Sequence, residues 1–217
     1  IEQNVVIGDN VVIECHTKVA RNCTIGAHTI LRAGVVLEYG SVLGEHCILN
    51  AHVTIGTDGF GYTPSSDMSS LVKIHHIGNV TLGDRIEIGS NSCVDRGKFG
   101  STSIGNGTKL DNLVQIGHNV TIGENCVIAS GSGLAGSVRV GNWVQIAAHV
   151  GIAPHCIVGD GAKIGAKSGL MHDIPAGEEW LGYPAGKLRD VLRQWACTRK
   201  LPRSIADFGK SNSCKDQ

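Results

Sequence analysis

The chain has 217 residues, and its 19 basic residues balance its 19 acidic residues, so no bulk electric field favours binding to nucleic acid or to a charged membrane surface. No stretch is apolar for long enough to cross a bilayer, and no charged, then apolar, then small-residue leader opens the chain. Thirty glycines stand against three Trp, three Tyr and three Phe, a balance that argues against a thick core and indicates a thin, turn-rich architecture.

The eight cysteines are scattered, and no C-x-x-C pair occurs among them. This spacing does not match a disulfide framework, so we interpret them as free thiols in a reducing compartment. Four of them occupy one position of a sequence repeat that elsewhere holds Val, Thr, Ser or Ala, namely Cys23, Cys47, Cys126 and Cys156. We expect these four to be small core residues.

An aliphatic residue, here called the anchor, recurs every six positions along most of the chain. The first run of anchors is Ile1, Ile7, Ile13, Val19, Ile25, Leu31, Leu37, Leu43, Leu49 and Ile55. After an interruption come Leu82, Ile88 and Val94, and then Ile104, Leu110, Ile116, Ile122, Ile128, Leu134, Val140, Ile146, Ile152, Val158, Ile164 and Leu170. Neither a helix nor a simple strand has a period of six, but a short strand followed by a sharp corner does.

Each six-residue unit therefore supplies one side of a prism, and three units close one triangular coil of the parallel β-helix type. Two residues before the anchor stands a small or β-branched residue, such as Val5 or Val120, that points inward with it. Glycine often follows the anchor, as at Gly8, Gly26, Gly44, Gly56, Gly83, Gly89, Gly105, Gly117 and Gly123. We expect a positive φ at these glycines, because a tight corner favours it.

Two breaks in the period predict loops that leave the coil, and such loops often carry function. The first covers about residues 57–77 and contains DGFGY at 58–62, and the second covers about 95–103 and contains DRG at 95–97. We therefore expect a β-helix over residues 1–175 with these insertions. Residues 176–217 should form a cap-like turn segment, a helix from about Lys187 to Lys200, and a frayed polar tail beyond Ser204.

Five motifs stand out between residues 56 and 186: DGFGY at 58–62, DRG at 95–97, KLDNLVQIGHN at 109–119, GLAGS at 133–137 and G-x-PAG at 182–186. Together they resemble the UDP-3-O-acylglucosamine N-acyltransferase family, which are hexapeptide-repeat acyltransferases of lipid A biosynthesis. The resemblance implies an all-β solenoid, the left-handed parallel β-helix, with a C-terminal α-helical extension. It also implies a homotrimer with sites between subunits that transfers a 3-hydroxyacyl group from acyl carrier protein to the 2-amine of UDP-3-O-acylglucosamine.

His118 matches the general base of this family. An amine loses a proton as it attacks a thioester, and a histidine is well suited to accept that proton. His118 stands two positions after an anchor, at a corner where other units carry Asp9, Glu45 or Asp84, so its side chain should point outward. From the pattern alone, a solvated corner residue is the alternative interpretation.

Two further residues follow the column of His118. His155 lies two coils and one residue further on, about 10 Å along the axis, and matches a second family histidine with a supporting role. Gly136 lies one coil beyond His118, and its amide is a candidate oxyanion donor. Asp111 and Asn112 match the family's DN pair, but within one chain they lie a face away and would reach His118 only across a subunit boundary.

Asp58, Phe60 and Tyr62 lie in the first loop, which we expect to contact the substrate, and a loop that only packs on its own prism is the alternative. His28 and His46 are one coil apart and should stack; a surface ladder is favoured over a metal pair because no third ligand accompanies them. No metal and no cofactor are expected, since the phosphopantetheine thioester of acyl carrier protein is itself the donor substrate.

The predicted C-terminal helix is rich in basic residues. They are Lys187, Arg189, Arg193, Arg199, Lys200 and Arg203, against Asp190. Acyl carrier protein is acidic, so we expect the helix to dock it, although a solvated basic face explains the pattern equally well. The expected partners are other copies of the chain, acyl carrier protein and the UDP-acylglucosamine, with no nucleic acid and no stable membrane insertion.

The chain departs from the family in one respect, because it begins inside the β-helix and lacks the N-terminal domain that holds the uridine. A β-helix scaffold and an acyltransferase with a different acceptor are therefore alternatives. The three-histidine zinc site of hexapeptide-repeat carbonic anhydrases needs an H-x-x-x-x-H spacing that is absent here, and DGFGY and DRG argue against the related O-acyltransferase. The expected location is the cytoplasm, or an organelle matrix if a leader was removed.

Overall fold

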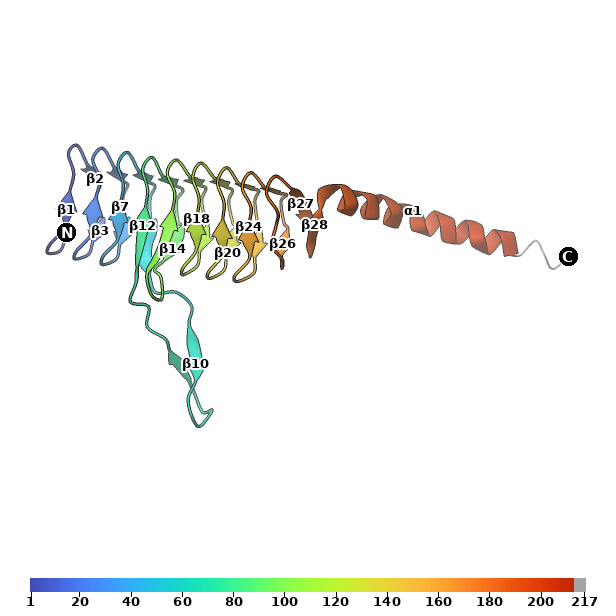
Figure 1. The fold of residues 1–217 in the computed structure, drawn as a ribbon, viewed down its shortest axis with the longest axis horizontal. Helices are drawn as coiled ribbons and strands as arrows, with labels where there is room; N and C mark the ends of the chain where they lie inside the picture. Colours follow the sequence, from blue (N-terminus) through green and yellow to red (C-terminus); the bar gives the residue numbers. More distant parts are fainter. Residues whose placement is uncertain (213–217) are drawn as a thin grey trace.

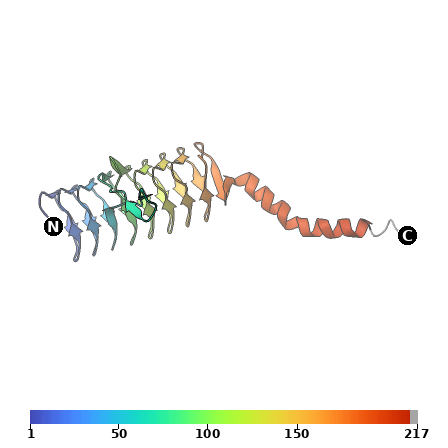
Figure 2. The same ribbon diagram turned by 90° about the horizontal axis from the view of Figure 1, so that it is seen from below.

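The computed structural model describes the backbone of residues 1–212 and the side chains of residues 1–201. The chain forms a triangular prism of short parallel strands, from which one hairpin and one C-terminal helix project (Figures 1 and 2). This is the parallel β-helix that the six-residue period predicts. No helix in the described residues is both long and apolar enough to cross a membrane.

Strands one coil apart pair in parallel and build the three faces of the prism. The first face contains β1 (Val6–Ile7), β4 (Thr24–Ile25), β7 (Val42–Leu43), β12 (Asn79–Leu82), β15 (Ser101–Ile104), β18 (Thr121–Ile122), β21 (Arg139–Val140) and β24 (Ile157–Val158). The second contains β2 (Val12–Ile13), β5 (Ile30–Leu31), β8 (Ile48–Leu49), β13 (Glu87–Ile88), β16 (Lys109–Leu110), β19 (Val127–Ile128), β22 (Gln145–Ile146), β25 (Lys163–Ile164), β27 (Glu179–Gly182) and β28 (Ala185–Lys187). The third contains β3 (Lys18–Val19), β6 (Val36–Leu37), β9 (Thr54–Thr57), β14 (Cys93–Asp95), β17 (Gln115–Ile116), β20 (Gly133–Leu134), β23 (Gly151–Ile152) and β26 (Gly169–Leu170).

The register of these pairs follows the repeat. On the third face Ile116 pairs with Leu134, and Leu134 pairs with Ile152, so each anchor lies beside the anchor three units further on. Each coil therefore consists of three six-residue units. Any residue of the sequence within the regular repeat can be placed on a face and at a height from its number alone.

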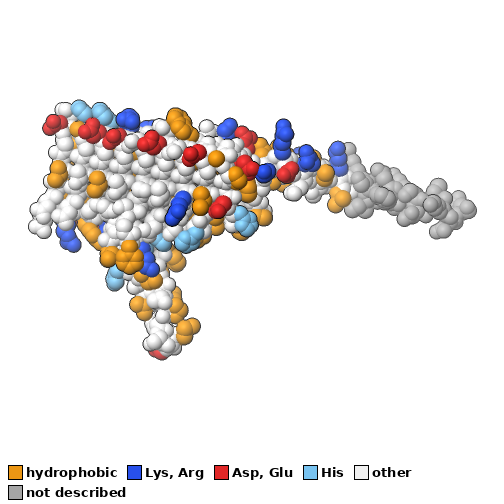
Figure 3. All heavy atoms as spheres, in the orientation of Figure 1, with side chains coloured by type: hydrophobic (Ala, Val, Ile, Leu, Met, Phe, Trp, Pro, Cys, Tyr) orange, Lys and Arg blue, Asp and Glu red, His pale blue; other side chains and the backbone are white. Residues whose placement is uncertain are grey.

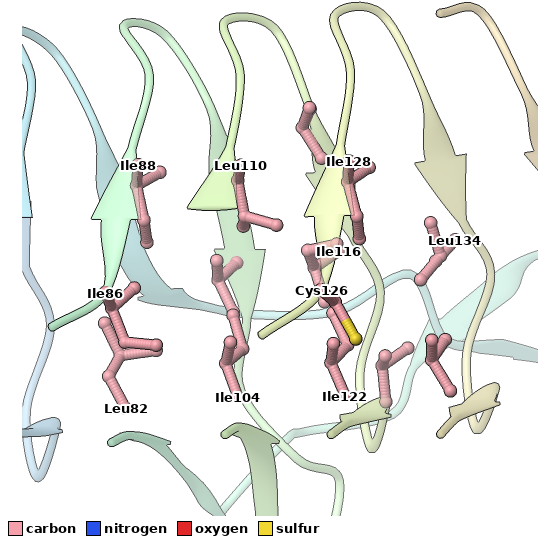
Figure 4. Packing of buried hydrophobic residues seen from close by; sticks show 14 of the residues in the cluster. Leu82, Ile86, Ile88, Ile104, Leu110, Ile116, Ile122, Cys126, Ile128 and Leu134 are labelled. Atoms are coloured by element: carbon pink, nitrogen blue, oxygen red, sulfur yellow. The ribbon is translucent and has the colours of Figure 1, made fainter. Parts of the chain in front are cut away.

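The anchors form the core of the prism, and every anchor from Val19 to Leu170 is buried (Figure 4). The first two, Ile1 and Ile7, are exposed, which contradicts their expected burial, because their coil is covered by a neighbouring coil on one side alone. Burying an aliphatic side chain stabilises by about 1.5–3 kcal/mol, so the anchors supply the main apolar contribution to the fold. The four cysteines at the repeat position are buried among them, which confirms their prediction as core residues.

The corners are not built as the glycine pattern predicts. Positive φ falls three positions after the anchor, for example at Asn119, and of the nine glycines that follow anchors only Gly56 has it. The others are needed because coils stack closely: a Cβ on Gly26 would lie 2.4 Å from the carbonyl carbon of Gly44. The expectation of positive φ was wrong because glycine is favoured both by positive φ and by close approach of two backbones, and the sequence does not distinguish these two causes.

The first break in the period forms a hairpin between β9 and β12. Its strands, β10 (Tyr62–Pro64) and β11 (Leu71–Lys73), pair antiparallel and project from the prism (Figure 1). The second break, between β14 and β15, is shorter and lies near the root of this hairpin, where the N–H of Ile77 donates to the carbonyl of Lys98 at 3.1 Å. The two breaks therefore meet, although they are separated by one coil of sequence.

The C-terminal end closes the second face with the hairpin of β27 and β28 and continues into α1 (Leu188–Asn212). The helix runs past Lys200, so the predicted helix end there and the frayed tail from Ser204 were wrong for residues up to 212. No glycine or asparagine that could act as a C-cap follows Lys200 directly, so the sequence contains no stop at that point. Residues 213–217 lie outside the described part of the chain.

Candidate active site

His118 stands at the corner that follows β17, with its ring held in one orientation by Asn119. The Nδ1 atom of His118 lies 3.1 Å from Oδ1 of Asn119. A flip of the side-chain amide of Asn119 would break two hydrogen bonds. Its Nδ2 donates to the carbonyl of Phe99 at 2.7 Å, and its Oδ1 accepts the N–H of Lys98 at 2.9 Å. An oxygen therefore faces Nδ1, so Nδ1 carries the proton and Nε2 is left with its lone pair.

Gly136 lies directly under that Nε2, one coil further along the third face. A Cβ on Gly136 would lie 2.6 Å from both Cε1 and Nε2 of His118, so only glycine leaves room for the ring. The carbonyl of Gly136 accepts the N–H of His155 at 3.2 Å. In the described part of the chain, no acceptor takes a hydrogen bond from the N–H of Gly136.

The free amide of Gly136 contrasts with the same position in other coils. There a side chain of the next coil often accepts a hydrogen bond from the backbone N–H. For example, the N–H of Glu124 donates to Oδ1 of Asn142 at 2.8 Å. The next coil beyond Gly136 has Pro154 at this position, and proline has no side-chain acceptor. A donor is thus left open beside the lone pair of His118.

His118 and Gly136 line a cavity of about 410 Å³. Phe60 and His155 line it too, so the structure brings together four of the residues that the sequence singled out. His155 is exposed and sits at a positive-φ corner, with φ of 64°. Most of the lining is apolar with a few polar side chains, as is usual for a small-molecule site.

Asp95 also lines this cavity, and the sequence analysis did not select it. Its side chain is nearly buried, and its Oδ1 accepts a hydrogen bond from Nε2 of Gln115 at 2.9 Å. Burial raises the pKa of the Asp95 carboxyl above its usual value. The DRG motif and its place in a break of the period were the signals that could have identified it.

Arg96, the next residue, ties the two breaks to the prism. The residue is 1 % exposed. Its guanidinium donates to the carbonyls of Gly56 at 2.6 Å and Gly78 at 3.1 Å and lies 3.7 Å from the ring centroid of Tyr39. A buried cation is stable only when such partners replace its water. Arg96 therefore fixes both ends of the hairpin segment relative to the coil next to the one that carries His118.

Asp58 and Tyr62, the other predicted loop residues, support this segment and do not line the cavity. Asp58 forms an ion pair with Lys73 at 2.5 Å, across the root of the hairpin, and this partner lowers the pKa of the Asp58 carboxyl. The ring of Tyr62 meets that of Phe60 edge to face at 5.3 Å. Figure 3 shows apolar and histidine side chains where the hairpin joins the prism.

His76 is a second residue that the sequence analysis missed as part of the site. Its ring is buried, and its centroid lies 5.0 Å from that of His118 at an angle of 60°. No pattern in the sequence could have placed it there, because it lies inside the first break, where the repeat no longer fixes positions.

Asp111 and Asn112 lie outside the cavity, at the corner after β16. Oδ2 of Asp111 accepts the N–H of Ser130 at 3.1 Å, and Oδ1 of Asn112 accepts the N–H of Ser90 at 2.7 Å. Within one chain both therefore cap backbone amides of neighbouring coils. Their predicted role in substrate binding stays a prediction.

The rings of His28 and His46 stack at 4.7 Å with an angle of 8° between their planes, as their one-coil separation predicts. No group of three or more histidine, cysteine or acidic side chains suited to a metal ion occurs among the described residues. The stacking is confirmed, and the choice of a surface ladder over a metal pair stays a prediction.

The basic residues of the C-terminal segment lie on the surface (Figure 3). Lys187 pairs with Glu178 at 2.6 Å, and Arg193 lies 3.7 Å from Asp190. The remaining predicted docking residues with described side chains, Arg189, Arg199 and Lys200, are exposed. The side chain of Arg203 lies outside the described residues.

The family model "Bacterial transferase hexapeptide (six repeats)" matches residues 4–39 and 101–136. The chain is 53% identical over 155 residues to UDP-3-O-acylglucosamine N-acyltransferase 1 of Francisella tularensis subsp. tularensis, covering 71% of this chain and 45% of that protein. It is 56% identical over 142 residues to the UDP-3-O-acylglucosamine N-acyltransferase of Rhizobium meliloti, covering 65% and 40%. The chain thus spans about half the length of the curated relatives it matches.

Solved structures confirm the fold. The UDP-N-acetylglucosamine acyltransferase from Bacteroides fragilis superposes with a TM-score of 0.78 at 25% identity, covering 86% of this chain and 71% of that one. The enzyme of the same name from Campylobacter jejuni gives 0.76 at 23% identity, covering 86% and 70%. The chain is a left-handed parallel β-helix of hexapeptide repeats and a homologue of the UDP-3-O-acylglucosamine N-acyltransferases.

Proposed function

We propose that the chain transfers a 3-hydroxyacyl group from acyl carrier protein to the 2-amine of UDP-3-O-acylglucosamine, a step of lipid A biosynthesis. The observation that carries the proposal is the placement of His118, whose Nε2 lone pair lies over Gly136 and at the wall of an apolar cavity. The identity of 53–56% to proteins named for this activity supports the same substrate class.

In the proposed reaction the amine nitrogen attacks the thioester carbonyl carbon while Nε2 of His118 takes the amine proton. Negative charge gathers on the carbonyl oxygen, and the open N–H of Gly136 is a donor for it. The C–S bond then breaks, the amide forms, and the phosphopantetheine sulfur takes the proton that His118 returns and leaves as the thiol. Each step conserves charge and atoms without a covalent enzyme intermediate, a metal or a cofactor.

Three residues support this reaction without taking part in the bond changes. Asn119 keeps Nδ1 of His118 protonated, so that Nε2 is the base. Phe60 and His155 line the cavity, and we assign them to substrate binding, with His155 in a supporting role. The exposed basic residues from Lys187 to Lys200 are assigned to docking of the acidic carrier protein.

The assembly belongs to the same proposal. A homotrimer would bring a neighbour's Asp111 and Asn112 toward the His118 edge, which one chain alone does not do. Nucleotide binding is assigned to the part of the relatives that this chain does not cover. Because the chain is 53–56% identical to N-acyltransferases and 23–25% identical to the solved UDP-N-acetylglucosamine acyltransferases, we favour the N-acyl reaction over O-acylation.

The test is acyl transfer from 3-hydroxyacyl carrier protein to UDP-3-O-acylglucosamine, measured for the chain alone and for a form joined to the N-terminal half of a curated relative. His118→Ala should abolish transfer, and Asn119→Ala should reduce it about 100-fold by releasing the tautomer. His28→Ala, which alters an exposed histidine far from the cavity in sequence, is the control and should retain activity. Inactivity of both forms with an intact β-helix would favour a scaffold or another acceptor.

A further inference from the structure

His76 contains the one buried side-chain polar atom without a hydrogen-bond partner among the described residues, its Nε2. The other ring nitrogen, Nδ1, lies 3.1 Å from the carbonyl oxygen of Ile74. A carbonyl oxygen accepts only, so Nδ1 must carry the proton and Nε2 must be an acceptor in the neutral ring. The structure thus contains a buried acceptor of known polarity and no donor for it.

This acceptor lies beside the proposed base. The ring centroids of His76 and His118 are 5.0 Å apart. A Cβ on Gly59 would lie 2.9 Å from Nε2 of His76 and 2.8 Å from Cβ of His118, so Gly59 bridges the two histidines. Phe60, the next residue, lines the cavity that contains His118. The unpaired atom is therefore separated from the cavity by the glycine segment.

The ring of His76 stays neutral near the working pH. Burial lowers the pKa of His76, and the neighbouring His118 lowers it further, whereas the contact with Ile74 and the charge of Asp58 raise it. The neutral ring keeps the lone pair on Nε2. This atom is consequently an acceptor whenever the proposed reaction runs.

Packing alone does not explain a histidine at this position. An unsatisfied buried acceptor destabilises the folded state, whereas an apolar side chain of similar volume carries no such penalty. Leucine would fill the same space without an unsatisfied acceptor, and it would remove the donor of the Ile74 carbonyl. An unpaired polar group that destabilises the fold beside the proposed base indicates that the bound ligand supplies its hydrogen-bond partner.

We propose that Nε2 of His76 accepts a hydrogen bond from a substrate hydroxyl that binds next to His118. The inference rests on the proposed function and extends it with a binding residue. Two hydroxyl sources are compatible with it, the sugar of the acceptor and the 3-hydroxyl of the acyl donor, because both meet at the reacting centre.

The glycine segment allows the ligand to reach Nε2. Gly59 covers the atom in this structure, and in the described chain no acceptor takes a hydrogen bond from the N–H of Gly59 or Phe60. The segment is held at its ends, by the ion pair of Asp58 with Lys73 and by the N–H of Ile74, which donates to the carbonyl of Gly61 at 2.9 Å. Its middle can shift without breaking a backbone hydrogen bond.

The test is the ¹⁵N resonance of His76 Nε2 in the full chain, recorded before and after addition of UDP-3-O-acylglucosamine alone or 3-hydroxyacyl carrier protein alone. We expect the resonance to be that of a free acceptor without ligand and to move to the hydrogen-bonded position with one of the two. Which ligand moves it identifies the source of the hydroxyl. A resonance that is already hydrogen-bonded without ligand, or that neither ligand moves, overturns the proposal.

Variants supply a second readout. His76→Leu should weaken binding of that ligand about tenfold, as measured by calorimetry, while circular dichroism shows that the β-helix remains folded. His76→Gln, which restores an acceptor, should recover part of the affinity, and His75→Leu, at the exposed neighbouring histidine, should change neither. Normal affinity in His76→Leu refutes the role of His76 and leaves the proposed function standing, whereas no ligand binding by the wild type removes the basis of both.

Discussion

Replacement of Gly136 by alanine tests whether the His118 ring must lie where the structure places it. The new Cβ would lie 2.6 Å from Cε1 and Nε2 of His118, whereas carbon atoms pack at about 3.5 Å or more, so the ring has to move by about 1 Å. The φ of Gly136 is not positive, so alanine fits the backbone there. A displacement of this size between reacting groups costs about 100-fold in rate.

We therefore expect Gly136→Ala to lower kcat for acyl transfer about 100-fold, with thermal unfolding close to that of the wild type. The rate is measured in the steady state with saturating donor and acceptor, and unfolding is followed by circular dichroism. Gly133→Ala is the matched control, because it lies on the same face with nothing within 4 Å of its new Cβ. Wild-type kcat in Gly136→Ala would refute the assignment of His118 as a base that acts from this position.

Three further predictions concern groups around the site. Arg96→Leu leaves the carbonyls of Gly56 and Gly78 without their donor and should lower the free energy of unfolding by about 2–4 kcal/mol in urea titrations, whereas the exposed Arg139→Leu should change it by less than about 0.5 kcal/mol. Because Lys73 lowers the pKa of Asp58, the ion pair at the hairpin root is fully formed above the ordinary pKa of 3.8 and is lost as pH falls through the lowered pKa, so hydrogen exchange in residues 62–73 should accelerate only well below pH 3.8 and not between pH 5 and 7. Burial beside Asp95 raises the pKa of the Cys93 thiol to about 12, so iodoacetamide at pH 8 should modify the exposed Cys15 and Cys197 well before Cys93, and equal rates would contradict the burial.

The regular part of the fold could be predicted in detail because the period converts a residue number into a position. Gly136 was placed on the column of His118 from one coil of separation, and the cavity contains both. The same arithmetic stacked His28 on His46. Where backbone pairing fixes the height of every residue, sequence distance and spatial distance are related by a simple rule.

The rule fails where the period breaks, and two further site residues lie in those breaks. Asp95 and His76 reach His118 through segments whose course depends on side-chain partners such as Arg96, and no spacing in the sequence encodes those partners. The length of α1 was missed for a related reason, because a helix that leaves the prism is not held by the repeat. The corner glycines show a third kind of limit, since close stacking and positive φ favour the same residue.

The site therefore combines a part that is fixed by the coils with a segment that can move. His118 and Gly136 are joined through the backbone ladder, in which the N–H of Ser137 donates to the carbonyl of His118 at 2.9 Å, so their spacing changes only if coils separate. Phe60 and Gly59 belong to a segment that is fixed at its ends and free in its middle. Proton transfer and charge stabilisation need fixed distances, whereas substrate entry needs a surface that can yield. On this reasoning, substitution of Phe60 should alter the apparent affinity for substrate more than kcat, and substitution of Gly136 should do the reverse.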